Sequence, residues 1–246
     1  MFIYQINLEY LGTNFVGWQF QKNGISVQEV LETALSKFLK DKIRVIGSGR
    51  TDAGVHAKGQ SAHFKTKRKI DYKDNFINSM NFFLRKYPVS ILSIRKRSKM
   101  FHARHSAKRR TYKYFIINRF SSLVLDKKKA WHVKKKLNIK IMRKGAKLLI
   151  GTHNFSTFRS SSCQSKSPVK TLKKVQIKKE KNKIIFTFES KSFLQQQVRS
   201  MVGSIKYLGE GKWNLKDFKK VFKSKKRSMC APPAPAHGLY LYEVKY

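Results

Sequence analysis

Phe2-Ile3-Tyr4-Gln5-Ile6-Asn7-Leu8-Glu9-Tyr10 opens the chain with an aromatic or aliphatic side chain at every second position. This alternation is the period of a β-strand with one buried face. Downstream, Ser26-Val27-Gln28-Glu29 has the form of a helix capping box, and apolar residues at helical spacing follow it to about Lys40. The chain therefore begins with a strand followed by an amphipathic helix.

The pattern continues as two strands, a helix and a strand. Ile43 to Ile46 predicts a short strand, and residues from Gly59 to Thr66 predict another, with Ser61, His63 and Lys65 on one side. A helix from Asp74 ends before Pro88, and residues 89–94 again resemble a strand. This helix is expected to bury Phe76, Ile77, Met80, Phe83 and Leu84. The order in this half is β-α-β-β-α-β.

The second half repeats that order with longer spacers. Strands are predicted at residues 111–118, 173–179, 184–189 and 239–244, and helices at residues 138–150, from Leu194 to Ile205 and from Leu215 to Phe222. We therefore predict an α+β fold of two ferredoxin-like, split β-α-β halves, residues 1–104 and 105–246. Joined edge to edge, they would form one extended antiparallel sheet with helices on one face and a central RNA-binding cleft.

The composition indicates a polyanionic partner. Lys and Arg number 55 and Asp and Glu number 13, which gives a net charge of +42 in a chain that is 41% hydrophobic. Such self-repulsion favours a protein that nucleic acid normally neutralises, although some of the lysines can simply be solvated. Neither a long apolar run nor a basic helix with a separate apolar face supports a membrane partner. The start of the chain lacks the pattern of a signal peptide, which favours the cytoplasm.

Cysteine and histidine give little support for a metal site. Cys163 and Cys230 are too few and too distant in sequence for a disulfide framework, and reduced structural thiols are expected. His102 and His105 are three residues apart, but basic residues surround them and no carboxylate is close in sequence. We therefore predict neither a metal nor a disulfide.

The stretch Gly49-Arg50-Thr51-Asp52-Ala53-Gly54-Val55-His56-Ala57 places a carboxylate between two glycines. Glycine adopts a positive φ and permits close approach of the backbone, so Asp52 is expected on a tight, exposed turn. Taken alone, an aspartate here is more typical of ordinary turn chemistry, in which its side chain accepts a hydrogen bond from a nearby main-chain N–H.

Five stretches in order along the chain resemble the tRNA pseudouridine synthase A family. They are Gly12-Thr13-Asn14-Phe15-Val16-Gly17-Trp18-Gln19, residues 49–57, Phe101-His102-Ala103-Arg104, Tyr112-Lys113-Tyr114 and Gly238-Leu239-Tyr240-Leu241. The resemblance spans nearly the whole chain, and five ordered matches are far more specific than one glycine-rich loop. It favours a catalytic over a structural aspartate at position 52.

The resemblance implies conversion of uridine to pseudouridine in the anticodon stem-loop of tRNA, at positions 38–40, with Asp52 as the essential catalytic group. It also implies that Tyr112 holds the target base, that Arg50 helps to displace it, that Arg199 pairs with the aspartate, and that two copies form a homodimer. Without the family match, Tyr112 is more typical of a strand core, and both arginines are equally typical of phosphate binding or plain surface charge. A carboxylate can act here as a nucleophile or as a base, and no cofactor is required because substrate and product are isomers.

The chain also departs from the family pattern. Gln195-Gln196-Gln197 precedes Val198-Arg199 where the family usually has an aromatic or histidine followed by histidine and methionine, and Leu11 and His105 replace more typical acidic and aromatic residues. A second hypothesis follows from these changes and from the high charge. The chain can be a catalytically inactive protein of the same fold that binds or chaperones tRNA.

Overall fold

The first strand of the chain is paired on both sides. In the computed structural model, which describes residues 1–246, β1 (Phe2–Tyr10) is antiparallel to β3 (His56–Thr66) and to β4 (Val89–Arg97). Ile6 is opposite Ala62 on one side and Ile94 on the other. Because the strand is central, Ile3 and Gln5 are buried as well as Tyr4, Ile6, Leu8 and Tyr10, whereas Phe2 is half-buried.

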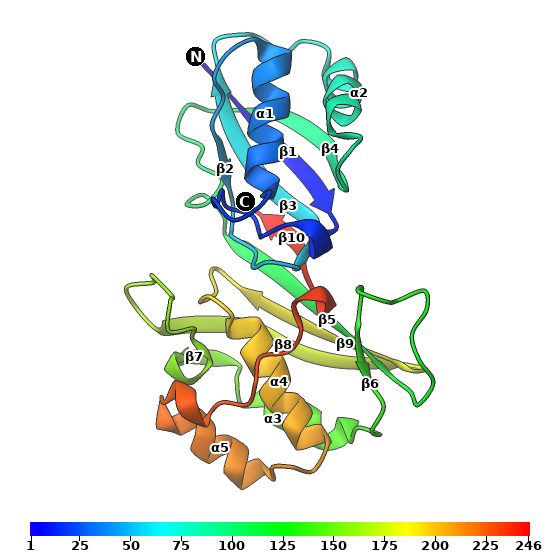
Figure 1. Ribbon diagram of the computed structural model, residues 1–246. Coiled ribbons are helices and arrows are strands. Elements are labelled where there is room, and N and C mark those ends of the chain that lie inside the picture. Colours follow the sequence, from blue (N-terminus) through cyan, green and yellow to red (C-terminus); the bar gives the residue numbers. More distant parts are fainter. The chain divides into compact units, whose positions relative to one another are not determined.

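The chain forms two compact units, each with its own sheet strands and helices (Figure 1). Unit 1 comprises residues 1–108 and Leu241–Tyr246, and unit 2 comprises Arg109–Tyr240. Five α-helices and a mostly antiparallel, mixed sheet confirm the predicted α+β class. None of the helices combines the length and hydrophobicity needed to cross a bilayer.

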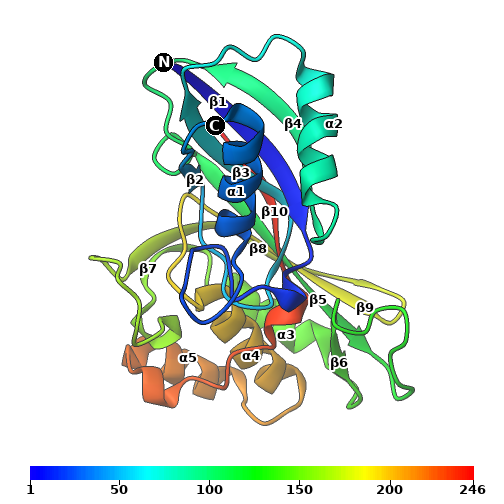
Figure 2. The same cartoon turned by 45° about the horizontal axis from the view of Figure 1, so that its top comes forward.

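Unit 1 has the strand order β4-β1-β3, with β2 (Val45–Gly47) paired to β3. The helix α1 (Val27–Leu39) begins with the predicted capping box, in which Ser26 accepts from the Glu29 N–H and Glu29 accepts from the Ser26 N–H. The helix α2 (Lys73–Leu84) lies beside it, with the Phe38 and Phe76 ring centroids 5.4 Å apart. Figure 2 shows α1 across one face of these strands and α2 beside β4.

Two details of unit 1 differ from the predictions. The strand β3 begins at His56 rather than Gly59, because it lies between paired neighbours and buries polar residues as well as apolar ones. Phe83 was predicted to be buried in α2 and this is wrong. It is 41% exposed, and Ile77, which was also predicted to be buried, is half-buried, since the buried positions of the helix are Phe76, Met80 and Leu84.

Unit 2 has the strand order β5-β9-β8-β7, formed by β5 (Arg109–Asn118), β9 (Lys183–Ser190), β8 (Val169–Glu180) and β7 (Gly151–Asn154). A short strand, β6 (Trp131–Val133), runs parallel to β5. The helices are α3 (Ile139–Lys147), α4 (Gln197–Gly209) and α5 (Leu215–Ser224). The final strand, β10 (Leu239–Lys245), begins in unit 2 and ends in unit 1.

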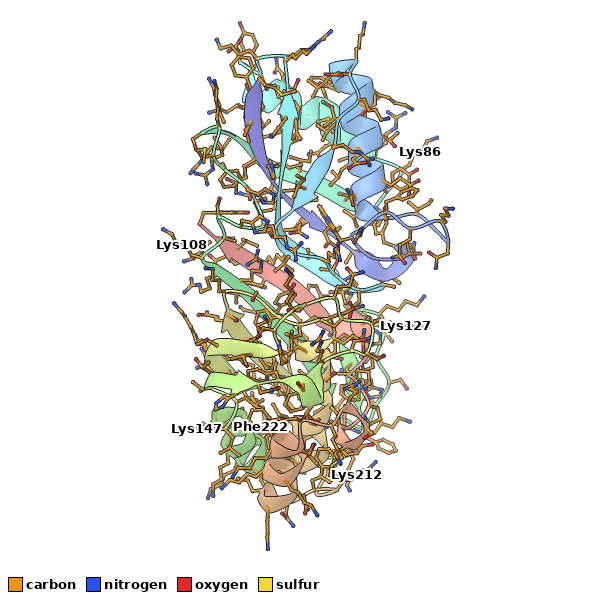
Figure 3. All side chains as sticks on the ribbon, turned by 90° about the vertical axis from the view of Figure 1, so that its left-hand side faces the viewer. Lys86, Lys108, Lys127, Lys147, Lys212 and Phe222 are labelled. Carbon is orange, nitrogen blue, oxygen red and sulfur yellow. The ribbon has the colours of Figure 1, made fainter.

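The core of unit 2 is aromatic and aliphatic. Tyr114 on β5 is opposite Phe186 on β9, and both are fully buried. The helix α4 is buried along most of its length, including Met201, Val202 and Ile205. Arg110 is buried, whereas Figure 3 shows the labelled lysines Lys86, Lys108, Lys127, Lys147 and Lys212 at the periphery.

Candidate active site

The stretch from Gly49 to Ala57 forms a tight turn between β2 and β3. The Val55 N–H donates to the Asp52 carbonyl oxygen at 3.1 Å, and Gly54 has a φ of +77° at the third position, as a type II turn requires. Thr51 and Val55 are buried on either side, whereas Asp52 is half-buried and Arg50 is exposed. The predicted tight turn is confirmed, but Asp52 is half-buried rather than exposed.

A second segment of unit 1, residues 12–19, lies directly against this turn. The Trp18 N–H donates to the Thr51 carbonyl oxygen at 3.1 Å, and the Gly54 N–H donates to the Phe15 carbonyl oxygen at 3.4 Å. Gly17 and Asp52 form a single antiparallel bridge. Two of the stretches that carried the family resemblance are thus joined in one main-chain arrangement.

Side chains fix both ends of the turn. The Tyr10 hydroxyl and Thr51 Oγ1 are 2.9 Å apart and buried, and the buried His56 accepts from the Gly12 N–H at its Nδ1 at 2.9 Å. At the upstream end, Gln60 Nε2 donates to the Gly49 carbonyl oxygen at 2.9 Å. Together these bonds hold the main chain on both sides of Asp52.

Tyr112 lies on β5 in unit 2, opposite Phe188 of β9. Its side chain is 7% exposed, and its ring meets Phe193 edge to face, with centroids 5.2 Å apart and an interplanar angle of 84°. Two residues further on, the Tyr114 hydroxyl donates to the Pro235 carbonyl oxygen at 2.8 Å. Burial raises the pKa of Tyr114 well above its usual value, despite the opposing effect of Arg199, so its hydroxyl keeps its proton at neutral pH.

Arg199 lies in the first turns of α4 and is tied to the segment that precedes β10. Its Nε donates to the Ala234 carbonyl oxygen at 2.8 Å, and the Ala234 N–H donates to the Arg199 carbonyl oxygen at 3.0 Å. This reciprocal pair fixes the plane of the guanidinium group. Arg199 is half-buried.

The glutamines that depart from the family pattern build the start of α4. Gln196 adopts a φ of +60°, a conformation that is uncommon outside glycine. Gln197 is fully buried, and its Oε1 accepts from the Leu194 N–H at 2.8 Å while its Nε2 has no hydrogen-bond partner. The third glutamine, Gln195, accepts from the Ser160 N–H through its carbonyl oxygen at 3.1 Å. Gln197 therefore has a structural role at the helix start.

Histidines gather at another place in unit 1. The rings of His63 and His102 are 5.0 Å apart, and those of His102 and His105 are 4.3 Å apart. The buried His63 accepts from the Ala103 N–H at its Nδ1 at 3.1 Å. Burial, followed by the charges of His102 and Lys65, lowers the pKa of His63 to about 4.

The four predicted site residues are divided between the two units. Arg50 and Asp52 lie together on the turn in unit 1, and Tyr112 and Arg199 lie in unit 2. Sequence reasoning missed the groups that hold them in place: Tyr10, Gly12 and Gly17 for the turn, and Ala234 for Arg199. The family resemblance of residues 12–19 could have indicated Gly12 and Gly17, whereas no signal in the sequence indicates Tyr10 or Ala234, because their partners are distant in sequence.

Comparison with known proteins identifies the family of this chain. The family described as tRNA pseudouridine synthase matches residues 7–106 and 146–246. The chain belongs to this family. The match includes Arg50, Asp52 and Arg199, while Tyr112 lies in the intervening segment.

Relatives from the tRNA pseudouridine synthase family extend over the whole chain. A protein of Pelagibacter ubique named tRNA pseudouridine synthase A is 59% identical over 246 residues, which is 100% of both chains. Proteins of the same name from Parvibaculum lavamentivorans and Methylocella silvestris are 42% and 43% identical, over 99% of this chain and 98% of theirs. The similarity therefore includes the segment around Tyr112 that the family match omits.

Proposed function

We propose that this protein is an isomerase that converts uridine to pseudouridine in tRNA. The observation that carries the proposal is membership of the tRNA pseudouridine synthase family, together with similarity over the full length to proteins named for that activity. The net charge of +42 suits a polyanionic substrate. Binding of tRNA in turn favours a cytoplasmic location.

The reaction rearranges one nucleotide without gain or loss of atoms. The bond between N1 of uracil and C1′ of the ribose breaks, and a bond between C5 and the same C1′ forms. The hydrogen on C5 leaves as a proton, and N1 gains a proton. Because substrate and product are isomers, the conversion itself needs neither an oxidant nor a reductant.

Asp52 is the proposed catalytic carboxylate. Its position on a turn braced by Gly12, Gly17 and Tyr10 supports this role, since a group that reacts with one sugar or base must be held in place. It acts either as a nucleophile or as a base, and both routes require the ionised carboxylate. Arg50, two residues away on the same turn, is proposed to displace the target base.

Tyr112 and Arg199 complete the proposed set. Tyr112 offers an aromatic ring on which an unstacked uracil can be held, and its edge-to-face contact with Phe193 fixes that ring. Arg199, oriented by Ala234, is proposed to keep the catalytic aspartate charged. Their assignment to the same reaction rests on the family resemblance.

Three finer features are proposed on the same basis. The target uridines are those at positions 38–40 of the anticodon stem-loop, and the active form is a homodimer. The fold is proposed to consist of two ferredoxin-like halves, and the strand order β4-β1-β3-β2 in unit 1 supports this for the first half. The extended sheet and the central cleft remain predictions.

The test is release of tritium from C5 of uridine in an unmodified tRNA transcript. Wild type is expected to release it, and Asp52→Asn to lower the rate by about 10²–10⁴-fold, the usual contribution of a catalytic acid or base. The control is Asp41→Asn, which removes an exposed carboxylate elsewhere in unit 1. Replacement of uridines 38–40 with cytidine is expected to abolish release.

The same assay distinguishes the second hypothesis of an inactive tRNA-binding protein. That hypothesis predicts tight binding of tRNA by wild type without release of tritium. Release by wild type that is undiminished in Asp52→Asn contradicts the role of this aspartate while retaining the activity.

A further inference from the structure

The connection between β5 and β6, residues 119–130, exposes large apolar side chains. Within this 119–130 loop, Phe120 is 84% exposed, Val124 is 78% exposed and Leu125 is 89% exposed. Figures 1 and 2 show the loop projecting beside β6. The loop also lies in the segment, residues 107–145, that the family match omits. Exposed apolar residues grouped on one loop indicate a surface with a partner.

The 119–130 loop is held in shape by its own bonds. The Arg119 guanidinium lies against the loop's own main chain. Its Nε donates to the Ser121 carbonyl oxygen at 3.2 Å and its Nη2 donates to the Ser122 carbonyl oxygen at 2.7 Å. Further along, the Tyr240 hydroxyl donates to the Lys129 carbonyl oxygen at 2.9 Å. The exposed side chains are therefore presented by an ordered main chain.

Asn118 closes the base of the loop. Its Nδ2 donates to the carbonyl oxygens of Val133 and Lys135, each at 2.8 Å, and its Oδ1 accepts from the Leu137 N–H at 3.1 Å. One side chain thus joins the end of β5 to the chain beyond β6. The main chain on either side of Phe120 is therefore tied by the Asn118 bonds and by the bonds from Arg119 to Ser121 and Ser122.

Lysines lie close in sequence to the exposed apolar residues of the 119–130 loop. Lys127, Lys128 and Lys129 are on the loop, Lys134, Lys135 and Lys136 follow β6, and Asp126 is the acidic residue of the segment. Lys134 Nζ is 5.8 Å from the centroid of the Phe120 ring. An aromatic ring among lysines is the combination that proteins use to bind single-stranded nucleic acid, with the ring stacked on a base and the lysines on phosphates.

The positive charge of the 119–130 loop also distinguishes two possible binding partners, a second copy of this chain and RNA. A second copy that docked through the same 119–130 loop would place its own Lys127, Lys128 and Lys129 against these lysines, and such like charges oppose association at this surface. The proposed homodimer would therefore form through another surface. A polyanion gains from the same lysines. RNA is therefore favoured over a second copy as the partner of this surface.

We propose that the 119–130 loop is a tRNA-contact surface in which Phe120 stacks on an unpaired base while the adjoining lysines bind phosphates. The proposal rests on tRNA being the substrate, and it adds a recognition surface beyond the residues assigned to catalysis. Because stacking requires a flat ring, Tyr can replace Phe120 and Leu cannot.

The experiment measures the equilibrium binding of an unmodified tRNA transcript at several salt concentrations. Phe120→Ala and Phe120→Leu are expected to weaken binding roughly 5- to 100-fold, the usual effect of one lost stacking contact, and Phe120→Tyr to retain it. The matched control is Phe82→Ala. Phe82 is 62% exposed and has the Arg85 guanidinium 3.9 Å from its ring centroid, but it lies on α2 in unit 1.

The salt dependence separates the two kinds of contact. Phe120→Ala is expected to lower affinity without changing the slope of log K against log salt. Lys127→Gln combined with Lys134→Gln is expected to reduce that slope by about 1–2, since each lost phosphate contact changes it by about 0.7–0.9.

Several results would overturn the proposal: unchanged binding by Phe120→Ala, full affinity of Phe120→Leu, or equal weakening by Phe82→Ala. A halved molar mass of Phe120→Ala in light scattering would instead assign the loop to contact between copies. Absence of tRNA binding by wild type would overturn both proposals. If wild type binds tRNA but releases no tritium, the isomerase proposal fails while the binding result still decides this one.

Discussion

Gly17 and Thr51 approach each other so closely that no side chain fits between them. A Cβ built on Gly17 would lie 2.7 Å from the Thr51 carbonyl oxygen, and Gly17 has a φ of +121°. That oxygen already accepts from the Trp18 N–H at 3.1 Å. Any residue with a Cβ at position 17 must therefore move the main chain next to Asp52.

Gly17→Ala is expected to impair both stability and turnover. The unfavourable φ and the steric overlap together should lower the free energy of unfolding by about 2 kcal/mol or more. Displacement of the turn should also reduce kcat for tritium release, because small misplacements of a catalytic group are costly. Urea denaturation and the tritium assay measure the two effects.

Gly211→Ala is the control for this substitution. Gly211 also has a positive φ, +76°, but a Cβ there would have nothing within 4 Å. It should show the loss of stability that comes from backbone strain, about 1–2 kcal/mol, with unchanged kcat. Wild-type kcat in Gly17→Ala would show that the contact with Thr51 does not position the turn that carries the proposed catalytic Asp52.

The buried His63 predicts loss of stability in acid. Its pKa in the folded protein is about 4, compared with 6.5 when unfolded, because burial disfavours the charged form and His102 and Lys65 add repulsion. Between these values the unfolded chain binds more protons, so stability falls as the pH is lowered from 6.5 to 4. At 1.36 kcal/mol per pKa unit, the upper bound is about 3 kcal/mol.

Urea denaturation across this pH range tests the effect. His63→Asn retains an acceptor for the Ala103 N–H and removes the titrating ring, so its stability should change less between pH 6.5 and 4 than that of wild type. His153→Asn, in unit 2, should retain the acid-dependent loss. An identical pH dependence in His63→Asn and wild type would contradict the assignment.

Local patterns in the sequence predicted the elements that depend on local interactions. The capping box at Ser26 and the spacing of apolar residues located α1 almost to the residue, and alternation located β1. The start of β3 was missed because His56 and Gln60 are polar but buried between neighbouring strands. The short strands β6 and β7 carry too few residues to show a period.

The same distinction between local and long-range interactions applies to the candidate site. Gly54 predicted the turn at Asp52, because a positive φ is a local requirement. The bonds that hold the turn join residues far apart in sequence, such as Tyr10 to Thr51, and no local pattern indicates them. Likewise, the glutamine run before α4 was interpreted as a departure near the site, whereas Gln197 proves to cap the Leu194 N–H.

Arg199 gives the sharpest test of the proposed site within unit 2. Arg199→Lys retains a positive charge but loses the Nε–H that donates to the Ala234 carbonyl oxygen, so the cation is no longer held in one plane. We expect kcat for tritium release to fall by about 100-fold. The affinity for tRNA should remain within about threefold, because the charge that attracts phosphate is retained.

Arg143→Lys is the matched control for this substitution. Arg143 on α3 also donates from its Nε to a carbonyl oxygen, that of Ile177, at 3.0 Å, but it has no proposed part in the reaction. Its replacement should leave kcat unchanged. Equal losses of kcat in the two variants would indicate a general effect on the folding of unit 2, and wild-type kcat in Arg199→Lys would remove Arg199 from the site.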